Sequence, residues 1–534
     1  MALISDPRPV AVDPDDGGAA AYPAGPGARP SYPPLLLLAA VAVALLALVP
    51  LGFVVGYTIS TGWAETVRLV VRPRTADLLW NTARLTAGCV LLCAVVGTAA
   101  AWLVERSSLP GRRVWNVLLV APLAVPAFVN GYGWVSITSA VTGYAGALLI
   151  VTLSYFPLVH LPVAAALRGL DPGLEETACA LGLSRWGAFR RVVLPQLRPA
   201  LLGGSLLVAL HLLAEFGALQ LLRYATFTTA IYDQYQSSFA SAAATMLAGV
   251  LVLCCLLLLL AEIRLRGRAR YARLGGGAPR PAGRTRLGRL TVPALAGLGA
   301  LVALALAVPL GSLVRWLVTG TSTAFDGRVL AEAAVTSLGL GAVAAGVTTL
   351  LAVPVAWLAV RHRGRLSTLL ERSTYVGSAL PGIVVALALV TIAIRGARPL
   401  YQTTPLLVAG YAILFLPRAM VTVRSALAQA PPVLDSVAHS LGAGTLSTLR
   451  RVTLPLVAPG LGAGAALVFL AVVTELTATL LLSPIGTRTL ATEFWQQSSS
   501  LAYGAAAPYA ALMVLISAPA TWLLTREPGR GTPR

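Results

Sequence analysis

Residues 175–195 read EETACALGLSRWGAFRRVVLP, and residues 435–455 read DSVAHSLGAGTLSTLRRVTLP. The two stretches lie 260 residues apart and share an alanine, a glycine, a pair of arginines and a closing Leu-Pro. The shared positions include Ala178 and Ala438, Leu181 and Leu441, Gly182 and Gly442, Arg190-Arg191 and Arg450-Arg451, and Leu194-Pro195 and Leu454-Pro455. Similarity at a fixed offset indicates an internal repeat.

The repeat extends beyond these stretches. At the same offset Glu215 falls on Glu475, and at an offset of 255 residues Pro126 falls on Pro381. The segment Ala101-Trp102-Leu103 also matches Ala356-Trp357-Leu358 at the second offset. We therefore predict a chain of two homologous halves.

The composition indicates a membrane protein. The chain has 534 residues, of which 57% are hydrophobic and 11% charged, whereas soluble domains carry about 25% charged residues. So few charges cannot cover a water-exposed surface of this size, which argues against a soluble enzyme. The apolar content excludes a disordered chain. The five cysteines show neither a disulfide pattern nor zinc-ligand spacing.

Twelve apolar stretches recur along the chain, many near the length of about 20 residues that a helix needs to cross a bilayer. They lie near residues 35–57, 83–104, 114–137, 143–167, 197–220, 242–262, 292–318, 332–360, 373–394, 403–422, 457–482 and 503–525. Helices are expected because each span must satisfy its own backbone hydrogen bonds in lipid. We predict an all-α polytopic membrane protein made of two six-helix repeats.

All 40 basic residues are arginines, and they predict the orientation. With a cytoplasmic N-terminus, the inner loops and the C-terminal tail hold 26 arginines, and the outer loops hold 8. This bias follows the positive-inside rule. Both termini are therefore expected in the cytoplasm, and the net charge of +20 needs no nucleic-acid partner.

The predicted units follow from these spans. They are a disordered tail at 1–34, six-helix halves at 35–262 and 292–525, a basic cytoplasmic linker at 263–291, and a tail at 526–534. Because each half has an even number of spans, both halves start on the same side of the membrane. Such parallel repeats are related by an axis along the membrane normal, and we expect a pathway along that axis.

Each half carries one long inner loop between its fourth and fifth spans. Its pattern is an acidic residue, small residues, three positions, glycine, nine positions, an aliphatic residue, any residue and Leu-Pro. In the first half these are Glu176-Thr177-Ala178, Gly182, Val192 and Leu194-Pro195. The pattern resembles the coupling loop, or EAA loop, of the permeases of ABC importers. The resemblance implies a type I (MetI-like) permease fold in a bacterial cell membrane, with one ATP-binding subunit docked on each loop.

The residues of the first loop fit such docking. Glu175 and Glu176 are expected in the first turn of a short amphipathic helix, where anions interact favourably with the helix dipole. Gly182 is expected to end that helix. Leu194-Pro195 is expected to begin the next span, because proline is tolerated in a first helical turn. The alternative is an amphipathic surface helix that binds nothing.

The second loop departs from the pattern. Ser436 stands where the acidic residue is expected, and Val437 replaces the first alanine, whereas Asp435 matches Glu175. We therefore expect the salt bridges of the second loop to differ from those of the first or to be weaker.

The energy source is expected outside this chain. A nucleotide-binding P-loop needs a lysine for the phosphates, and the chain contains none. No predicted cytoplasmic region exceeds about 40 residues, which is too short for a nucleotide-binding domain. We predict that the chain is not an enzyme, that it carries no cofactor, and that ATP and Mg²⁺ bind to the partner subunits.

Among ABC importers, the sequence is most similar to permeases that fuse two halves in one chain, and within these to ferric-iron permeases. The similarity covers roughly residues 35–525 and includes LPGIVVAL at 380–387, TELTAT at 474–479, TRTLAT at 487–492 with Trp495, and YATFTTAIY at 224–232. It implies ferric iron as substrate and an extracytoplasmic binding protein as partner. Thiamine and aminophosphonates are alternatives, because their permeases share the fused plan.

Four acidic residues are matched between the halves. Glu215 and Glu475 lie inside the predicted fifth and eleventh spans, where an ionisable group is costly and often functional. We expect them to face each other across the pathway and to attract a cation such as ferric iron, which prefers oxygen ligands. Alternatively, each is neutralised by a buried hydrogen bond or lies near the outer interface. Asp233 and Glu493 are expected on the outer side, where they either receive the binding protein or are solvated.

Two other functional classes need different features. A proton-coupled secondary transporter would use Glu215 or Glu475 as its proton site without an ATPase, but the paired loops argue against it. A membrane enzyme needs a clustered catalytic set, and the sequence contains neither such a cluster nor metal-ligand spacing. His160 and His211 have no matched partner in the second half and are interpreted as packing residues.

Overall fold

The computed structural model describes residues 32–238, 241–266, 284–319, 326–362 and 364–525, and the elements that it contains there are helices. Nearly all of the predicted tail at 1–34, most of the predicted linker at 263–291 and the predicted tail at 526–534 lie outside the described residues.

The first half contains α1 (Pro34–Thr61), α2 (Trp63–Val70), α3 (Pro73–Arg106), α4 (Arg112–Val120), α5 (Ala127–Val135), α6 (Gly143–Tyr155), α7 (Pro157–Gly169), α8 (Pro172–Ala180), α9 (Arg185–Ala188), α10 (Leu194–Ala214), α11 (Gly217–Leu221), α12 (Phe227–Ser238) and α13 (Ser241–Arg266). The second half contains α14 (Thr291–Val302), α15 (Val308–Thr319), α16 (Gly327–Arg361), α17 (Arg365–Thr374), α18 (Gly382–Gly396), α19 (Thr404–Gln429), α20 (Pro432–Ser440), α21 (Thr445–Thr448), α22 (Leu454–Val473), α23 (Thr477–Leu482), α24 (Leu490–Ser499) and α25 (Tyr503–Thr525). Short 3₁₀ or π turns are η1 (Ala121–Ala124), η2 (Phe189–Val193), η3 (Gly288–Leu290), η4 (Ala303–Ala307), η5 (Tyr375–Ala379), η6 (Arg398–Leu400) and η7 (Leu449–Thr453).

Helices overlap all twelve predicted spans. Within the described residues, nine helices are long and apolar enough to cross a membrane, and the number rises to eleven if each of two bent pairs is one span. The last predicted span falls on α25, whose apolar part, Tyr503–Pro519, is shorter. The fold is therefore all-α with two repeats, as predicted.

Two predicted spans are not straight. The helical segments before and after Pro126 meet at 90°, and those before and after Pro381 meet at 105°. The residues that precede these prolines, Val125 and Leu380, have extended backbone with ψ of 110° and 118°. Proline disfavours the helical region for the residue before it. The two matched prolines thus bend the third span of each half at the same place.

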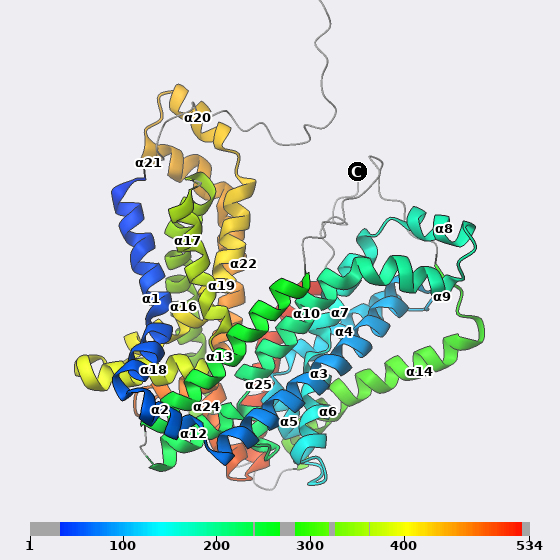
Figure 1. Ribbon diagram of the computed structural model, residues 1–534, viewed down its shortest axis with the longest axis horizontal. Coiled ribbons are helices and arrows are strands. Elements are labelled where there is room, and N and C mark those ends of the chain that lie inside the picture. The colour runs from blue at the N-terminus through cyan, green and yellow to red at the C-terminus, as the bar shows by residue number, and fades with distance from the viewer. Residues whose placement is uncertain (1–31, 239–240, 267–283, 320–325, 363, 526–534) are drawn as a thin grey trace, which may run out of the picture.

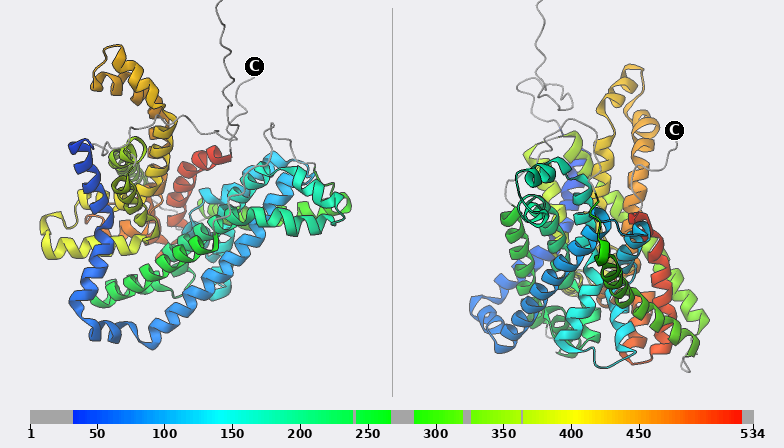
Figure 2. Two further views of the ribbon diagram at one scale, coloured as in Figure 1. Left: turned by 45° about the horizontal axis from the view of Figure 1, so that its top comes forward. Right: turned by 90° about the vertical axis from the view of Figure 1, so that its right-hand side faces the viewer.

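The described helices form two lobes that diverge toward one end of the molecule (Figures 1 and 2). One lobe contains α16, α17, α19 and α22, and the other contains α3, α4, α7 and α10. The end at which the lobes diverge carries α8 and α9 of the first half and α20 and α21 of the second, together with the start of α1. The opposite end carries α2, α12 and α24.

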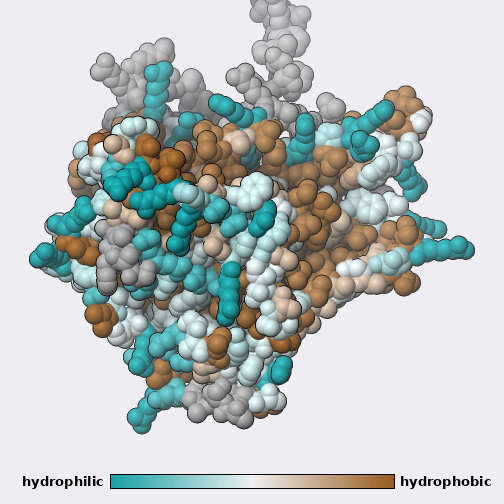
Figure 3. Space-filling view, turned by 60° about the horizontal axis from the view of Figure 1, so that its bottom comes forward, coloured by the Kyte–Doolittle hydropathy of each residue, from teal (hydrophilic) through white to brown (hydrophobic). Residues whose placement is uncertain are grey.

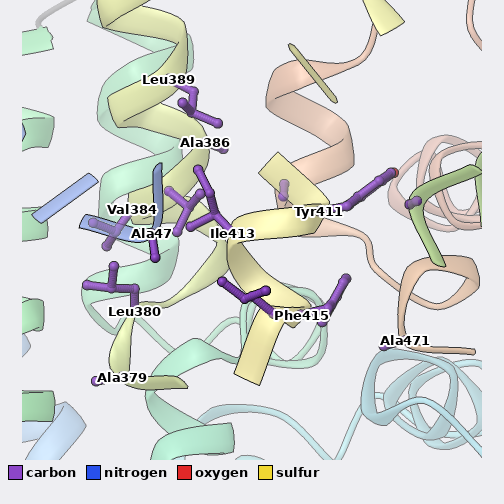
Figure 4. Packing of buried hydrophobic residues seen from close by; sticks show 14 of the residues in the cluster. Ala47, Ala379, Leu380, Val384, Ala386, Leu389, Tyr411, Ile413, Phe415 and Ala471 are labelled. Carbon is purple, nitrogen blue, oxygen red and sulfur yellow. The ribbon is translucent and has the colours of Figure 1, made fainter. Parts of the chain in front are cut away.

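The first span of each half packs against the other half. α1 lies along α16 and α17, and its buried residues recur at helical spacing as Ala40, Val43, Ala44 and Ala47. Small residues let helices approach closely in a membrane. Figure 4 shows Ala47 beside Val384 and Ile413 in the apolar cluster of the second half.

The first span of the second half likewise packs against the first half. α15 packs on α5, and a Cβ added at Gly133 would lie 2.6 Å from Cα of Pro309. The two predicted halves are therefore cross-packed rather than separate bodies.

Much of the outer surface is apolar. Figure 3 shows apolar side chains grouped over wide areas of one face, next to hydrophilic ones. Leu45, Leu91 and Leu350 lie within long apolar helices and are 62%, 64% and 72% exposed. Apolar side chains at such positions would contact lipid rather than water.

The close packing of α3 on α7 predicts a stability effect. A Cβ added at Gly97 would lie 3.0 Å from the backbone N of His160 and the backbone O of Phe156. We expect Gly97→Leu to separate these helices and to destabilise the protein by about 1–3 kcal/mol or more. Gly346→Leu is the matched control, because no atom lies within 4 Å of a Cβ there. Thermal denaturation in detergent measures the difference, and equal midpoints for the two variants would contradict the packing argument.

Candidate coupling loops and translocation pathway

The first loop contains a short helix with defined ends. α8 begins after Asp171, whose carboxylate accepts a hydrogen bond of 2.9 Å from the backbone N–H of Gly173. Its last helical residue is Ala180, and Gly182, which has a φ of +92°, terminates it two residues later. The N–H of Gly182 donates to Cys179 O, and the N–H of Leu183 donates to Ala178 O. This is a Schellman motif, in which a left-handed residue satisfies the last carbonyls of a helix.

The second loop repeats the C-terminal geometry despite its different sequence, whereas Pro431 before α20 provides no side-chain cap. α20 has the same length as α8 and is terminated by Gly442, which follows its last residue, Ser440, by two positions and has a φ of +82°. The N–H of Gly442 donates to His439 O, and the N–H of Ala443 donates to Ala438 O. The substitutions that distinguish this loop, Ser436 and Val437, are exposed and leave the helix end unchanged.

An ion pair ties each short helix to its own half. Arg106 at the end of α3 lies 3.7 Å from Glu175, and Arg361 at the end of α16 lies 3.1 Å from Asp435. Both pairs join matched positions, which lie 69 residues apart in the first half and 74 residues apart in the second. The second bridge thus differs from the first, as expected, because Asp435 takes the place of Glu175 and also accepts a hydrogen bond of 2.8 Å from Thr453. Its N–O distance is the shorter of the two, so the distances do not indicate a weaker bridge.

The second acidic residue of the first loop is not part of this pair. Glu175 lies in the first turn of α8, as expected, whereas Glu176 lies one residue beyond and is exposed. Ser436, which matches it, is also exposed. The departure of the second loop from the pattern thus affects a surface position only.

Each loop returns to the long helix through the same irregular turn. The π-helical turns η2 and η7 contain the arginine pairs, and both pass directly into helices that start with Leu194-Pro195 and Leu454-Pro455. The sequence predicted these starting residues but not the π turns. Single π turns in helices occur frequently at functional sites.

The predicted pathway glutamates do not lie inside continuous helices. Glu215 directly follows α10 and precedes α11, and Glu475 lies between α22 and α23. The spans expected over 197–220 and 457–482 are thus interrupted at the same place in both halves. Each glutamate accepts a hydrogen bond from the backbone N–H three residues later, from Ala218 at 2.9 Å and from Ala478 at 3.0 Å.

The surroundings of the two carboxylates differ. Oε2 of Glu215 accepts a hydrogen bond of 2.5 Å from the hydroxyl of Tyr155. Glu475 instead interacts electrostatically with Arg418, and it also interacts with Glu215. The two glutamates are thus near enough to influence each other, and their role in one pathway stays a prediction.

Arg418 is a candidate that the sequence reading missed. It lies in the middle of α19 and is exposed, although Pro417 and Ala419 on either side are buried. Its charge acts on Glu475 in the same half and on His211 in the other half. Arg418 therefore faces the space between the lobes. The signal was available, because a charged residue inside an apolar span is often functional.

The axial cluster is the name we give to Tyr155, His211, Glu215, Arg418 and Glu475. The ring of His211 lies 5.6 Å from the ring of Tyr155, which places His211 in this cluster, and its interpretation as a packing residue stays a prediction. His160 is fully buried between α3 and α7, in keeping with a packing role.

The outer acidic pair is not equivalent in the two halves. Asp233 is exposed and accepts a hydrogen bond of 3.2 Å from Gln220. Glu493 is buried and lies 3.6 Å from Arg488. Burial raises the pKa of the Glu493 carboxyl above its usual range, although Arg488 lowers it. Of the two, only Asp233 is accessible to a binding protein.

Two stretches of the chain match one protein family. Residues 94–270 and 348–526 each match the binding-protein-dependent transport system inner membrane component. Each stretch contains one short loop helix with its glycine and Leu-Pro, so the two matches correspond to the two halves. The chain belongs to this family. The predicted family and the predicted two-repeat fold are confirmed.

Full-length relatives agree. The Fe(3+)-transport system permease protein FbpB 2 of Haemophilus influenzae is 38% identical over 503 residues, which cover 93% of this chain and 99% of the relative. The ferric transport system permease protein FbpB of Actinobacillus pleuropneumoniae is 23% identical over 495 residues, covering 85% of this chain and 71% of the relative. The sulfate transport system permease protein CysT of Escherichia coli is 32% identical over 192 residues, covering 33% and 69%.

The chain is thus a multi-pass permease subunit of a binding-protein-dependent ABC importer. Such a system implies a separate ATPase subunit and a binding protein as partners. The predicted location of ATP hydrolysis on another subunit is confirmed by this membership.

The ion pair at the base of the second loop predicts a measurable effect. We expect Asp435→Asn to lower the stability of the permease by about 2 kcal/mol, because it leaves the largely buried Arg361 without its charge partner. The charge exchange Asp435→Arg with Arg361→Asp should recover much of this loss. Thermal midpoints of the purified protein measure both effects. Ser436→Ala is the control, and an equal loss in that variant would contradict the anchoring role of the pair.

Proposed function

We propose that this permease carries ferric iron across the membrane between its two lobes, driven by two ATP-binding subunits that dock on α8 and α20. The observation that carries the proposal is the pair of loops with matching internal geometry, each tied by an ion pair to its own half. A short helix fixed at its base transmits a displacement that a flexible loop would absorb. One ATP-binding subunit for each loop agrees with the twofold repeat.

The tips of the loops support docking. Leu181 is 82% exposed and Leu441 is 81% exposed, and they occupy matched positions directly before the two glycines. Trp186 is 67% exposed in the first loop. Large apolar side chains gathered on an exposed surface are typical of a protein contact. We propose that these side chains enter a groove on each ATP-binding subunit.

We propose that the end of the molecule with α8 and α20 faces the cytoplasm and that both chain termini lie on that side. Three features support this orientation: the excess of arginines in the predicted inner loops, the start of α1 at the same end, and the need of the ATP-binding subunits for cytoplasmic ATP. A binding protein would then deliver substrate at the opposite end, where α2, α12 and α24 lie.

The lobes diverge toward the proposed cytoplasmic end, which corresponds to an inward-open state (Figure 1). Alternating access would then be a rocking of one lobe against the other around the axial cluster, as in other transporters with repeated halves. Closure of the loops by the ATP-binding subunits would bring the lobes together at that end and open the pathway toward the binding protein.

The assignment to ferric iron rests on the similarity to FbpB 2 and on the chemistry of the axial cluster. Carboxylate oxygens suit a hard cation, and the cluster contains two. Among the described residues, no group of three or more His, Cys, Asp or Glu is placed to hold a metal ion. Few ligands suit a passing substrate, because conduction requires sites that are weak enough to release it.

The substrate is tested with the complete importer in proteoliposomes. We expect ferric-loaded binding protein to stimulate ATP hydrolysis and iron uptake, and thiamine-loaded or sulfate-loaded binding proteins to have no effect. Stimulation by one of the latter alone would replace ferric iron by that substrate and leave the permease mechanism intact.

The two pathway carboxylates are tested by substitution. Glu215→Gln and Glu475→Gln keep the size of the side chain and remove its charge, and each should lower iron uptake about tenfold, since one lost charge interaction of about 1.4 kcal/mol changes a rate by that factor. Glu65→Gln is the matched control, because Glu65 is a carboxylate of α2 outside the axial cluster, with a side chain 47% exposed. Unchanged iron uptake in both pathway variants would contradict a role of these two residues in the pathway.

The two loop glycines test the docking. Gly182→Val with Gly442→Val places a β-branched residue at positive φ, which costs roughly 1–2 kcal/mol at each site. We expect the ATP-binding subunits to be lost on co-purification. Gly444→Ala is the control, since Gly444 is in the same loop and a Cβ there meets nothing within 4 Å. A double variant that keeps a fully coupled complex would exclude the loops as docking elements.

A further inference from the structure

The segment after the predicted linker contacts the turn between α3 and α4. Thr285 forms a parallel β-bridge with Ser107. The N–H of Thr285 donates to the carbonyl of Arg106 at 2.9 Å, and the N–H of Ser108 donates to the carbonyl of Thr285 at 3.0 Å. A segment that leads into the second half is thereby fixed to the end of α3 in the first half.

A cavity of about 490 Å³ that is open to the surface lies at this contact, and three arginines line it, of which Arg113 and Arg284 are exposed and Arg112 is half-buried. Arg112 and Arg113 come from the first turn of α4, and Arg284 comes from the residue before the bridge. Ser108 and Gly111 complete its polar side. The positive charge of the cavity thus comes from two segments that are far apart in the sequence.

The nearby carboxylates are already paired. Glu105 lies 2.6 Å from Arg168, and Glu175 lies 3.7 Å from Arg106. Within the described ranges, no ion pair involves any of the three arginines of the cavity. Three guanidinium groups around one space repel one another unless an anion lies between them.

The start of α4 adds further donors. α4 has nine residues and begins after Gly111, which is left-handed and provides no side-chain cap. The first N–H groups of a helix lack partners within it and attract anions. At α4 these are the N–H groups of Arg112 and Arg113, because the N–H of Val114 donates to Gly111 O at 2.9 Å. Arginine also matches the geometry of phosphate oxygens, because its planar fork donates two parallel hydrogen bonds.

We propose that this cavity binds a phosphate group, and that the bound phosphate holds residues 284–285 against the end of α3. The level of the site favours a phospholipid head group as the source, because α3 ends there as a membrane-spanning helix and basic pockets at such ends bind anionic head groups. Arg106 connects the site to the first coupling loop. Its carbonyl accepts the bridge from Thr285, and its side chain pairs with Glu175 of α8. An occupied site therefore braces the base of the first coupling loop.

The test measures hydrogen exchange at the bridge in the complete importer, embedded in nanodiscs of phosphatidylcholine alone or with phosphatidylglycerol. A ligand present at about ten times its Kd slows opening about tenfold. We expect phosphatidylglycerol to slow exchange at the amides of Ser108 and Thr285 by this factor. Saturating inorganic phosphate added to phosphatidylcholine discs forms the second arm, and slowing there would identify free phosphate as the source.

Substitutions locate the site. Arg284→Gln should reduce the slowing to about threefold, and the double change Arg112→Gln with Arg113→Gln should nearly abolish it, since each arginine contributes about fivefold to binding of an anionic head group. Arg286→Gln is the matched control, because Arg286 is equally basic, two residues away and outside the cavity. Thermal midpoints in phosphatidylcholine discs check that all variants are folded. No slowing in either arm, or equal loss in Arg286→Gln, would overturn the proposal, because the arginines would then act only through their general charge.

Discussion

A break in a membrane span leaves the last carbonyl groups of one helix and the first N–H groups of the next without partners in the helix, and lipid cannot satisfy them. This constraint shapes the centre of the molecule. Both halves interrupt a span at the same place, after α10 and after α22. In each case a glutamate carboxylate accepts a hydrogen bond from a backbone N–H at the start of the next helix. Glu215 accepts from the N–H of Ala218, and Glu475 accepts from the N–H of Ala478. The carboxylates proposed to guide the substrate are therefore also required by the backbone. The repeat places these two interruptions near each other, and the axial cluster follows from that placement.

The loops and the interior differ in how far the sequence predicts them. The loop helices depend on local chemistry, such as a glycine at positive φ and a proline in a first turn, so the repeated residues identify both of them. In contrast, the surroundings of Arg418 and the packing of α1 depend on which helices become neighbours in the folded protein. Spans that are apolar on all sides do not encode their neighbours, because lipid and protein are alike in polarity. The ion pairs of Arg106 and Arg361 could be predicted only in part, since the acids were recognised and their partners were not.

The backbone of the two halves is more symmetric than the charges that they carry. At the offset that matches the loops, Arg418 corresponds to Leu158 and Tyr155 corresponds to Phe415. One glutamate therefore has a phenol as its neighbour and the other a guanidinium. A permease made of two identical chains could not hold such a difference. Fusion of the halves allows each side of the pathway to be adjusted separately while the shared frame is kept.

The crossing of the first spans has a mechanical consequence. α1 lies along α16 and α17, and α15 lies along α5, so each half packs one of its helices against the other half. A protease that cut between residues 267 and 283 would break the chain without releasing either fragment, since two interlocked pieces would remain. During rocking, the first helix of each half must move with the opposite lobe. The turn at Gly62, between α1 and α2, therefore connects a helix that moves with one lobe to a chain that continues in the other.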